Sequence, residues 1–209
     1  MAGRCGNGGI RVDDALGVAR KSARRPSQSY YGKFRGQTTP NPMRDYSRSP
    51  MTAVQVLKEH WNGALPIGLA HIAESMGIRL YKRENPSVIG EASFDPDGNY
   101  QIIIDPNQSK PRRRFTVAHE IGHIALGHLR RGEVNSLFRD KVEDFSTSRR
   151  DSREVAANKF AAELLMPAEL VRTAFQKMPG FTVQKGAEIF GVSEAAMGYR
   201  LMNLGLMRD

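Results

Sequence analysis

The chain has 209 residues, a formal net charge of +9 and one cysteine. This length gives room for one domain, or for one domain with a small appendage. A lone cysteine excludes an internal disulfide framework and fits a reducing compartment, and no apolar run is long enough for a signal peptide or a membrane span. We therefore expect a soluble, cytoplasmic protein.

The positive charge is concentrated at the start of the chain. Residues 1–50 hold ten Lys or Arg and three Asp, a net charge of +7, whereas residues 51–209 have a net charge of only +2. The first segment is also rich in Gly, Ser and Pro and has little periodic apolar content, which predicts a basic, disordered tail. The remainder is close to neutral, so its charge does not indicate nucleic-acid binding.

The segment that follows the tail is predicted to fold as two helices and a small sheet. Apolar periodicity indicates the helices, and Gly77 is a C-cap signal for the second. The sequence Asp95-Pro96-Asp97-Gly98 predicts a hairpin turn. The expected helices span 52–61 and 66–76, and the expected strands span 78–82, 88–94 and 99–104. The last strand is a candidate for holding an extended substrate as an added strand, although an ordinary core strand explains the pattern as well.

The motif His119-Glu120-Ile121-Gly122-His123 lies in the next predicted helix. Ser109 and Pro111 are residues that suit the start of this helix. Two histidines four residues apart project from one face of a helix, where they can share a zinc ion. The glutamate beside them can act as a general base toward a water molecule. The alternative is a pair of core histidines with hydrogen-bond partners, but it leaves Glu120 unexplained.

His128 follows the motif without continuing it. It comes five residues after His123, and on a continued helix it would point roughly 180° away from His119. We expect it to cap the helix end, where a cation suits the carbonyl dipole, and not to bind metal. The charged segment 130–150 is predicted to be a connection with a short helix around 137–145.

A downstream carboxylate is the best candidate for a third metal ligand, because the remaining histidines, His60 and His71, lie far upstream. The segment 153–167 reads as a helix that ends at a proline. Glu154 lies in the middle of its apolar stripe. Asn158, one turn later, points the same way and can hydrogen-bond a ligating histidine.

Two acidic residues of this helix have simpler explanations that remain open. Glu154 can be an exposed acid at the helix start, where it suits the dipole. Glu163 lies on the side opposite Glu154, near Lys159, and a solvated ion pair between Glu163 and Lys159 accounts for it.

The last part of the chain, residues 183–190, Gly191 and residues 193–204, reads as helix, tight turn and helix. Ser193 can N-cap the second helix. This helix offers only one cation, Arg200, to a DNA groove. Packing or protein docking is therefore favoured over DNA reading.

Three stretches resemble the ImmA/IrrE family of zinc metallopeptidases: residues 114–123 (RFTVAHEIGH), 154–167 (EVAANKFAAELLMP) and 192–206. The resemblance covers about residues 51–209. It implies a gluzincin-like site with His119, His123 and Glu154 as zinc ligands. It also implies that Glu120 is the base. The family's characterised members are bacterial or phage proteins that cleave helix-turn-helix repressors, and others accompany such a repressor in toxin–antitoxin-like or stress-response pairs.

These features predict an α+β protein: a helix-rich, zincin-like domain with a small three-stranded antiparallel or mixed sheet beside the HExxH helix, and a helix-turn-helix-like C-terminal module. The expected parts are a tail (1–50), the metallopeptidase domain (51–178) and the module (179–209). The expected function is an intracellular endopeptidase that uses one zinc ion, or another divalent metal, to cleave a specific repressor or antitoxin. The alternatives are a non-catalytic metal-containing partner-binding protein and a DNA-binding regulator, with direct DNA binding disfavoured. The sequence gives no oligomeric state.

Overall fold

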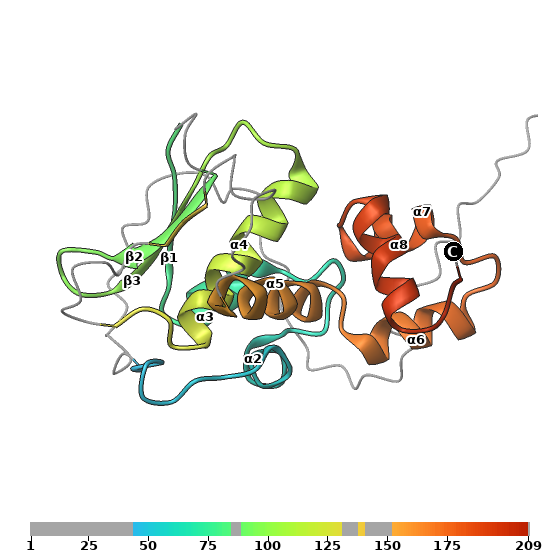
Figure 1. Cartoon of the computed structure of the whole chain (residues 1–209), viewed down its shortest axis with the longest axis horizontal. Coiled ribbons are helices and arrows are strands. Elements are labelled where there is room, and N and C mark those ends of the chain that lie inside the picture. Colours follow the sequence, from blue (N-terminus) through green and yellow to red (C-terminus); the bar gives the residue numbers. More distant parts are fainter. Residues whose placement is uncertain (1–43, 85–88, 131–137, 141–151, 209) are drawn as a thin grey trace, which may run out of the picture.

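The computed structural model describes residues 44–84, 89–130, 138–140 and 152–208, so most of the predicted tail lies outside it. The described residues contain seven α-helices and four β-strands, which confirms the helix-rich α+β class (Figure 1). In Figure 1 the sheet lies at one end of the molecule and the C-terminal helices lie at the other. None of the described helices combines the length and the apolar character that a membrane crossing requires.

The sheet is mixed and small. Its strands are β1 (Arg79–Lys82), β2 (Gly90–Phe94), β3 (Tyr100–Ile104) and β4 (Phe138–Asp140), in the order β1-β3-β2-β4. Strand β1 pairs parallel with β3, and β2 pairs antiparallel with β3 and with β4. The turn between β2 and β3 is closed by a 2.8 Å hydrogen bond from Gly98 N to Asp95 O, and Gly98 has a φ of 80°. The three predicted strands and their hairpin are therefore confirmed.

Two expectations about this sheet are wrong. Strand β3 lies between β1 and β2, so its backbone is already paired on both sides and it cannot accept a substrate as an added strand. Within the segment expected to hold a short helix, residues 137–145, Phe138–Asp140 form strand β4 instead. Three residues are too few to show an alternating pattern in a sequence, and the other residues of that segment lie outside the described part.

Helices α2 (Ala53–His60) and α3 (Leu69–Ser75) confirm the first two predicted helices. Thr52 starts α2 with a capping box, in which Gln55 N donates to Thr52 Oγ1 and Thr52 N donates to Gln55 Oε1. Gly77, with a φ of 75°, follows the end of α3 as predicted. Both helices bury their apolar faces in the core.

Helix α4 (Lys110–Ala125) is the central element of the main body. Ten consecutive residues, Thr116 to Ala125, are buried. The helix packs against β2 and β3 and against α5 (Ser152–Leu165) (Figure 1). Gly122 permits the close approach of α4 to α5, because a Cβ at this position would lie 3.1 Å from the Phe160 ring and 3.3 Å from the Ala157 carbonyl oxygen.

The chain continues as a helix beyond Pro167. This proline is the N-cap of α6 (Ala168–Lys177), a helix that the sequence reading did not anticipate. Helix α7 (Val183–Phe190), a left-handed Gly191 with a φ of 65°, and α8 (Glu194–Asn203) follow. The helix, turn and helix predicted at the C-terminus are therefore present.

Arg114 of α4 attaches the C-terminal module to the main body. Its guanidinium donates hydrogen bonds of 2.9 Å to the carbonyl oxygens of Gly191, at the end of α7, and Ile67. Burial lowers the pKa of Arg114. The group remains cationic, and a cation suits the carbonyl end of a helix. The start of α4 and the end of α7 are thereby held together.

The segment just before α2 belongs to the folded body. Tyr46 is 1% exposed, its hydroxyl donates to Met76 O at 3.4 Å, and its ring lies 5.7 Å from that of Tyr100. The predicted tail, residues 1–50, therefore ends in a segment that packs into the core. The burial of Tyr46 could not be predicted from the sequence, because a single buried side chain leaves no periodic pattern.

Candidate metal centre

Helix α4 places the two motif histidines side by side in the core. His119 is 2% exposed and His123 is fully buried. Their Nε2 atoms lie 2.9 Å apart, and their rings meet edge to face with centroids 4.6 Å apart. The spacing of four residues predicted this shared face, and the two Nε2 atoms point to one place.

Glu154, in the first turn of α5, lies against the two histidines and completes a cluster of three. Its carboxylate oxygens lie 3.1 Å from His119 Nε2 and 3.3 Å from His123 Nε2. Partial burial acts to raise the pKa of Glu154, but hydrogen bonds from the two histidines outweigh it and hold the pKa well below its ordinary value. This carboxylate therefore stays charged, and its oxygens point at the histidines although 37% of the side chain is exposed.

These three residues fit a metal ion. One ligand atom from each of His119, His123 and Glu154 lies within 4.8 Å of the others, and no other group of this kind occurs among the described residues. Two imidazoles and one carboxylate are a donor set of catalytic zinc sites, which leave a fourth position for water or substrate. The three donor groups are therefore of the kind that the HExxH motif predicts for a zinc site.

The ring nitrogens on the far side of the histidines also have partners. Asn158 Oδ1 lies 3.0 Å from His119 Nδ1, which places the predicted residue in hydrogen-bond contact with the predicted histidine. His128 Nδ1 lies 3.0 Å from His123 Nδ1. The backbone N–H of His128 does cap the helix end, since it donates to the His123 carbonyl oxygen at 2.9 Å, but its imidazole contacts His123 instead of the helix carbonyls. Helix α4 ends at Ala125, so the helical phase that pointed His128 away from the motif no longer applies.

Glu120 is the residue after His119 on α4, and its carboxylate lies beneath strand β2. It is fully buried, and a Cβ on Gly90 would come within 3.0 Å of Glu120 Oε1 and would clash with the methyl group of Thr116. Gly90 is a residue that sequence reasoning missed. Its signal was a glycine inside a predicted strand, which often marks a close approach of the backbone to another group.

Glu163 is directed away from the histidines, as its helical phase predicted. Its partner is not Lys159 but Arg200 of α8, with which it forms an ion pair. Arg200 also donates to the Met166 carbonyl oxygen at 2.9 Å. The expected solvated pair on α5 is therefore replaced by a link between α5 and α8, which helical periodicity within one segment cannot reveal.

The amino-acid sequence matches the model of a known protein family. The model of the IrrE N-terminal-like domain matches residues 73–202, which include all three residues of the metal cluster. The chain belongs to this family.

Three known proteins are similar to this chain over part of their length. Metallopeptidase ImmA of Bacillus subtilis (strain 168) is 30% identical over 105 residues, 50% of this chain and 58% of that protein. Radiation response metalloprotease IrrE of Deinococcus deserti is 36% identical over 84 residues, 39% of this chain and 27% of that protein. Uncharacterized immunity region protein 2 of Bacillus phage phi105 is 31% identical over 145 residues, 61% of this chain and 85% of that protein. The chain thus spans less than two thirds of the two named metallopeptidases.

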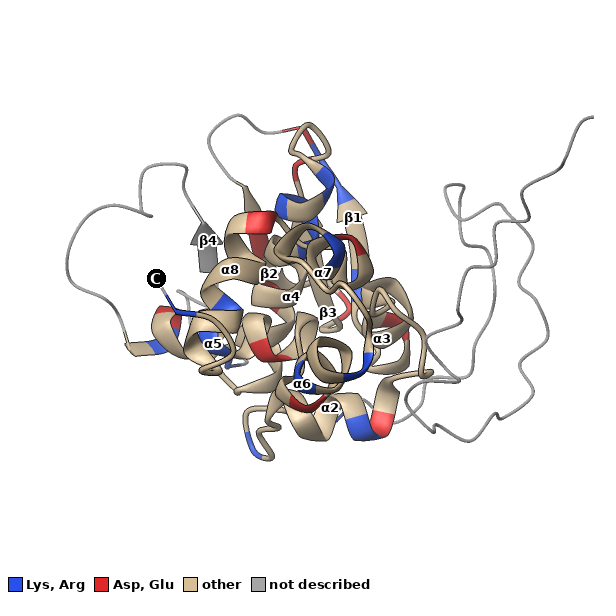
Figure 2. Cartoon of the chain, turned by 90° about the vertical axis from the view of Figure 1, so that its right-hand side faces the viewer, with Lys and Arg blue, Asp and Glu red and all other residues tan. Residues whose placement is uncertain are grey.

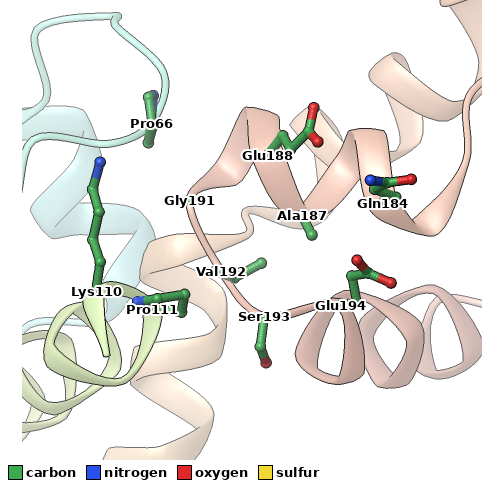
Figure 3. Close-up of a pocket in the computed structure, with 10 residues that line it drawn as sticks. All are labelled: Pro66, Lys110, Pro111, Gln184, Ala187, Glu188, Gly191, Val192, Ser193 and Glu194. Atoms are coloured by element: carbon green, nitrogen blue, oxygen red, sulfur yellow. The ribbon is translucent and has the colours of Figure 1, made fainter. Parts of the chain in front are cut away.

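A cavity of about 390 Å³ lies apart from the metal cluster, between the start of α4 and the turn of the C-terminal module (Figure 3). Its lining comprises Pro66, Lys110, Pro111, Gln184, Ala187, Glu188, Gly191, Val192, Ser193 and Glu194. None of His119, His123 and Glu154 contributes to it. In Figure 3, Lys110 faces it from the α4 side, and Glu188 and Glu194 flank it on the module side.

Proposed function

We propose that this protein is a zinc-dependent endopeptidase that hydrolyses a peptide bond in a specific protein partner. One observation carries the proposal: the buried His119–His123 pair of α4 converges with the Glu154 carboxylate of α5. Membership of the IrrE N-terminal-like family supports it. Two relatives, ImmA and IrrE, are named as metallopeptidase and metalloprotease.

The residues divide the chemistry between binding and proton transfer. When bound, zinc would polarise the scissile carbonyl group and lower the pKa of a water molecule toward about 7. His119 and His123 bind it only as neutral rings, so metal is released in acid. Glu120 accepts the proton of the attacking water on its carboxylate and passes it to the leaving amine.

We propose that the partner is a helix-turn-helix repressor or antitoxin and that the C-terminal module docks on it. The two basic residues of α7 and α8 are both engaged by backbone carbonyls: Lys185 Nζ donates to Gly180 O at 2.9 Å, and Arg200 Nε donates to Met166 O. Figure 2 shows acidic and basic residues interspersed over α6, α7 and α8 rather than a continuous basic face. A module of this kind is poorly suited to DNA phosphates and better suited to a protein surface.

The test is to incubate the zinc-loaded protein with the helix-turn-helix repressor encoded nearest to its gene, and separately with casein. We expect one cut in the repressor, little digestion of casein, and no cut by the Glu120→Gln variant, which should still hold zinc. Efficient digestion of casein, with the repressor left intact, would refute the proposal that the repressor is the specific substrate. Stable binding of the repressor without any cut would favour the non-catalytic alternative.

A further inference from the structure

Four side chains form a continuous row through the metal centre. Asn158 Oδ1 lies 3.0 Å from His119 Nδ1, the two motif histidines meet through Nε2 atoms 2.9 Å apart, and His123 Nδ1 lies 3.0 Å from His128 Nδ1. Each motif histidine thus has one nitrogen toward the metal cluster and the other toward a neighbouring polar side chain. His128 occupies for His123 the place that Asn158 occupies for His119.

The backbone after α4 fixes the position of His128. Gly127 N donates to Ile124 O at 3.0 Å and His128 N donates to His123 O at 2.9 Å, which is the hydrogen-bond pattern of a Schellman turn. Gly127 has a φ of 72°, and a Cβ there would lie 2.8 Å from the Tyr46 carbonyl oxygen. The segment around Tyr46 therefore leaves room only for glycine at position 127. The turn directs the His128 ring back toward the C-terminal end of α4.

Proton positions decide what this contact does. His123 can offer Nε2 to a metal only when that nitrogen is bare, so its single proton must be on Nδ1. The Nδ1–H then needs an acceptor, and His128 Nδ1 can accept when the His128 ring carries its own proton on Nε2. With the opposite arrangement, in which His128 donates, His123 would carry its proton on Nε2 and direct it at His119.

We propose that His128 is a positioning residue for the metal centre: as a neutral ring it accepts the Nδ1–H of His123, and so keeps His123 Nε2 bare and aimed at the metal position. It is not a fourth ligand. Its Nδ1 faces the side of His123 that is turned away from the cluster, and the two rings meet edge to face with centroids 5.0 Å apart. The proposal rests on the proposed metal-binding role of His119, His123 and Glu154. It adds that the contact with His128 sets the tautomer of His123.

The test compares two substitutions of similar size, His128→Gln and His128→Leu. The Gln amide oxygen can accept the His123 Nδ1–H, whereas the Leu side chain cannot. Zinc affinity is measured on the full chain by competition with a chelator, and the visible spectrum of the cobalt(II) form reports on ligand geometry. The melting temperature of the metal-free protein is measured beside them, because a purely packing role would change it.

We expect His128→Leu to weaken zinc binding by about 10- to 100-fold and to alter the cobalt spectrum, as loss of such a partner does elsewhere. His128→Gln should recover most of the affinity. Equal losses in the two variants, or unchanged affinity in both, would overturn the proposal, whatever happens to the melting temperature. Failure of the unsubstituted protein to bind zinc would instead refute the metal centre itself, so the two failures are distinguishable.

Discussion

The side-chain oxygen of Asn158 lies 3.0 Å from Nδ1 of His119 and joins helix α5 to the metal-binding face of α4. Asn158 stands one turn after Glu154, so a single face of α5 supplies both a candidate ligand and the partner of another. The contact needs the two helices to lie close together, and Gly122 provides the room. The packing of α4 on α5 therefore determines the geometry of the metal centre.

Replacing Asn158 should weaken metal binding without removing it. In Asn158→Ala the Nδ1–H of His119 loses its acceptor, and we expect zinc affinity to fall by about 10-fold or more. Asn158→Asp keeps an acceptor oxygen at the same place and should bind zinc far better than the alanine variant. Competition with a chelator measures both, and equal affinity of the two variants would show that the acceptor does not matter.

Gly90→Ala should destabilise the protein and disturb Glu120. The new methyl group would collide with the Thr116 side chain and approach Glu120 Oε1, and overpacking of this kind in a core costs about 1–3 kcal/mol. Gly198→Ala in α8 is the control, because a Cβ there meets nothing within 4 Å and should raise helix stability by up to about 1 kcal/mol. Urea unfolding measures both changes, and a Gly90→Ala variant as stable as the parent would contradict the close contact.

The convergence of the three candidate ligands could be predicted because it follows from helical periodicity. Residues four apart on α4 share a face, and the position of Glu154 within the apolar stripe of α5 distinguished it from Glu163. Both arguments need only one helix at a time, and the structure brings His119, His123 and Glu154 together accordingly. The hairpin turn between β2 and β3 could also be predicted, because the sequence of such a turn determines its local conformation.

The features that could not be predicted depend on contacts between elements. Gly90 is distant from Glu120 in the sequence, and Arg200 reaches Glu163 from another helix. The position of His128 depends on where α4 ends, which is the least certain part of a helix prediction. Strand β4 exists through its pairing with β2, and three residues carry too little pattern to reveal it.

The buried segment around Tyr46 leads to a prediction about the start of the fold. A chain that begins at Arg44 should be as stable as the full chain, whereas one that begins at Met51 loses the Tyr46 ring from the core. Removal of a fully buried aromatic side chain costs about 3–5 kcal/mol, so Tyr46→Ala should show a loss of this size and Tyr46→Phe a much smaller one. Equal urea midpoints for the chains beginning at residues 44 and 51 would contradict this role.

His60 predicts a dependence of stability on pH that is independent of the metal. Burial lowers its pKa below the ordinary value of 6.5, although Glu59 opposes the shift. The unfolded chain therefore takes up a proton near pH 6.5 while the folded protein still keeps His60 neutral. Stability attributable to this residue is complete above about pH 6.5 and falls as the pH drops toward the folded pKa.

The measurement is urea unfolding of the metal-free protein between pH 7.5 and 5.5, with His60→Gln as the matched variant. Glutamine can still accept a hydrogen bond from the Ser75 hydroxyl, which lies 2.7 Å from His60 Nδ1, but it does not titrate. The parent should lose more stability in acid than the variant does. A parallel decline of the two, or a steeper decline of the variant, would show that His60 is not held neutral.

The number of zinc ions retained per chain after dialysis tests the central claim most directly. The parent, Glu120→Gln and Glu163→Gln should each retain one ion, because Glu120 is proposed as a base and Glu163 is paired with Arg200. His119→Ala and Glu154→Gln should each lose it, because they remove ligands. The contradicting result is a Glu163→Gln variant that loses zinc while Glu154→Gln keeps it, or a parent protein that retains none.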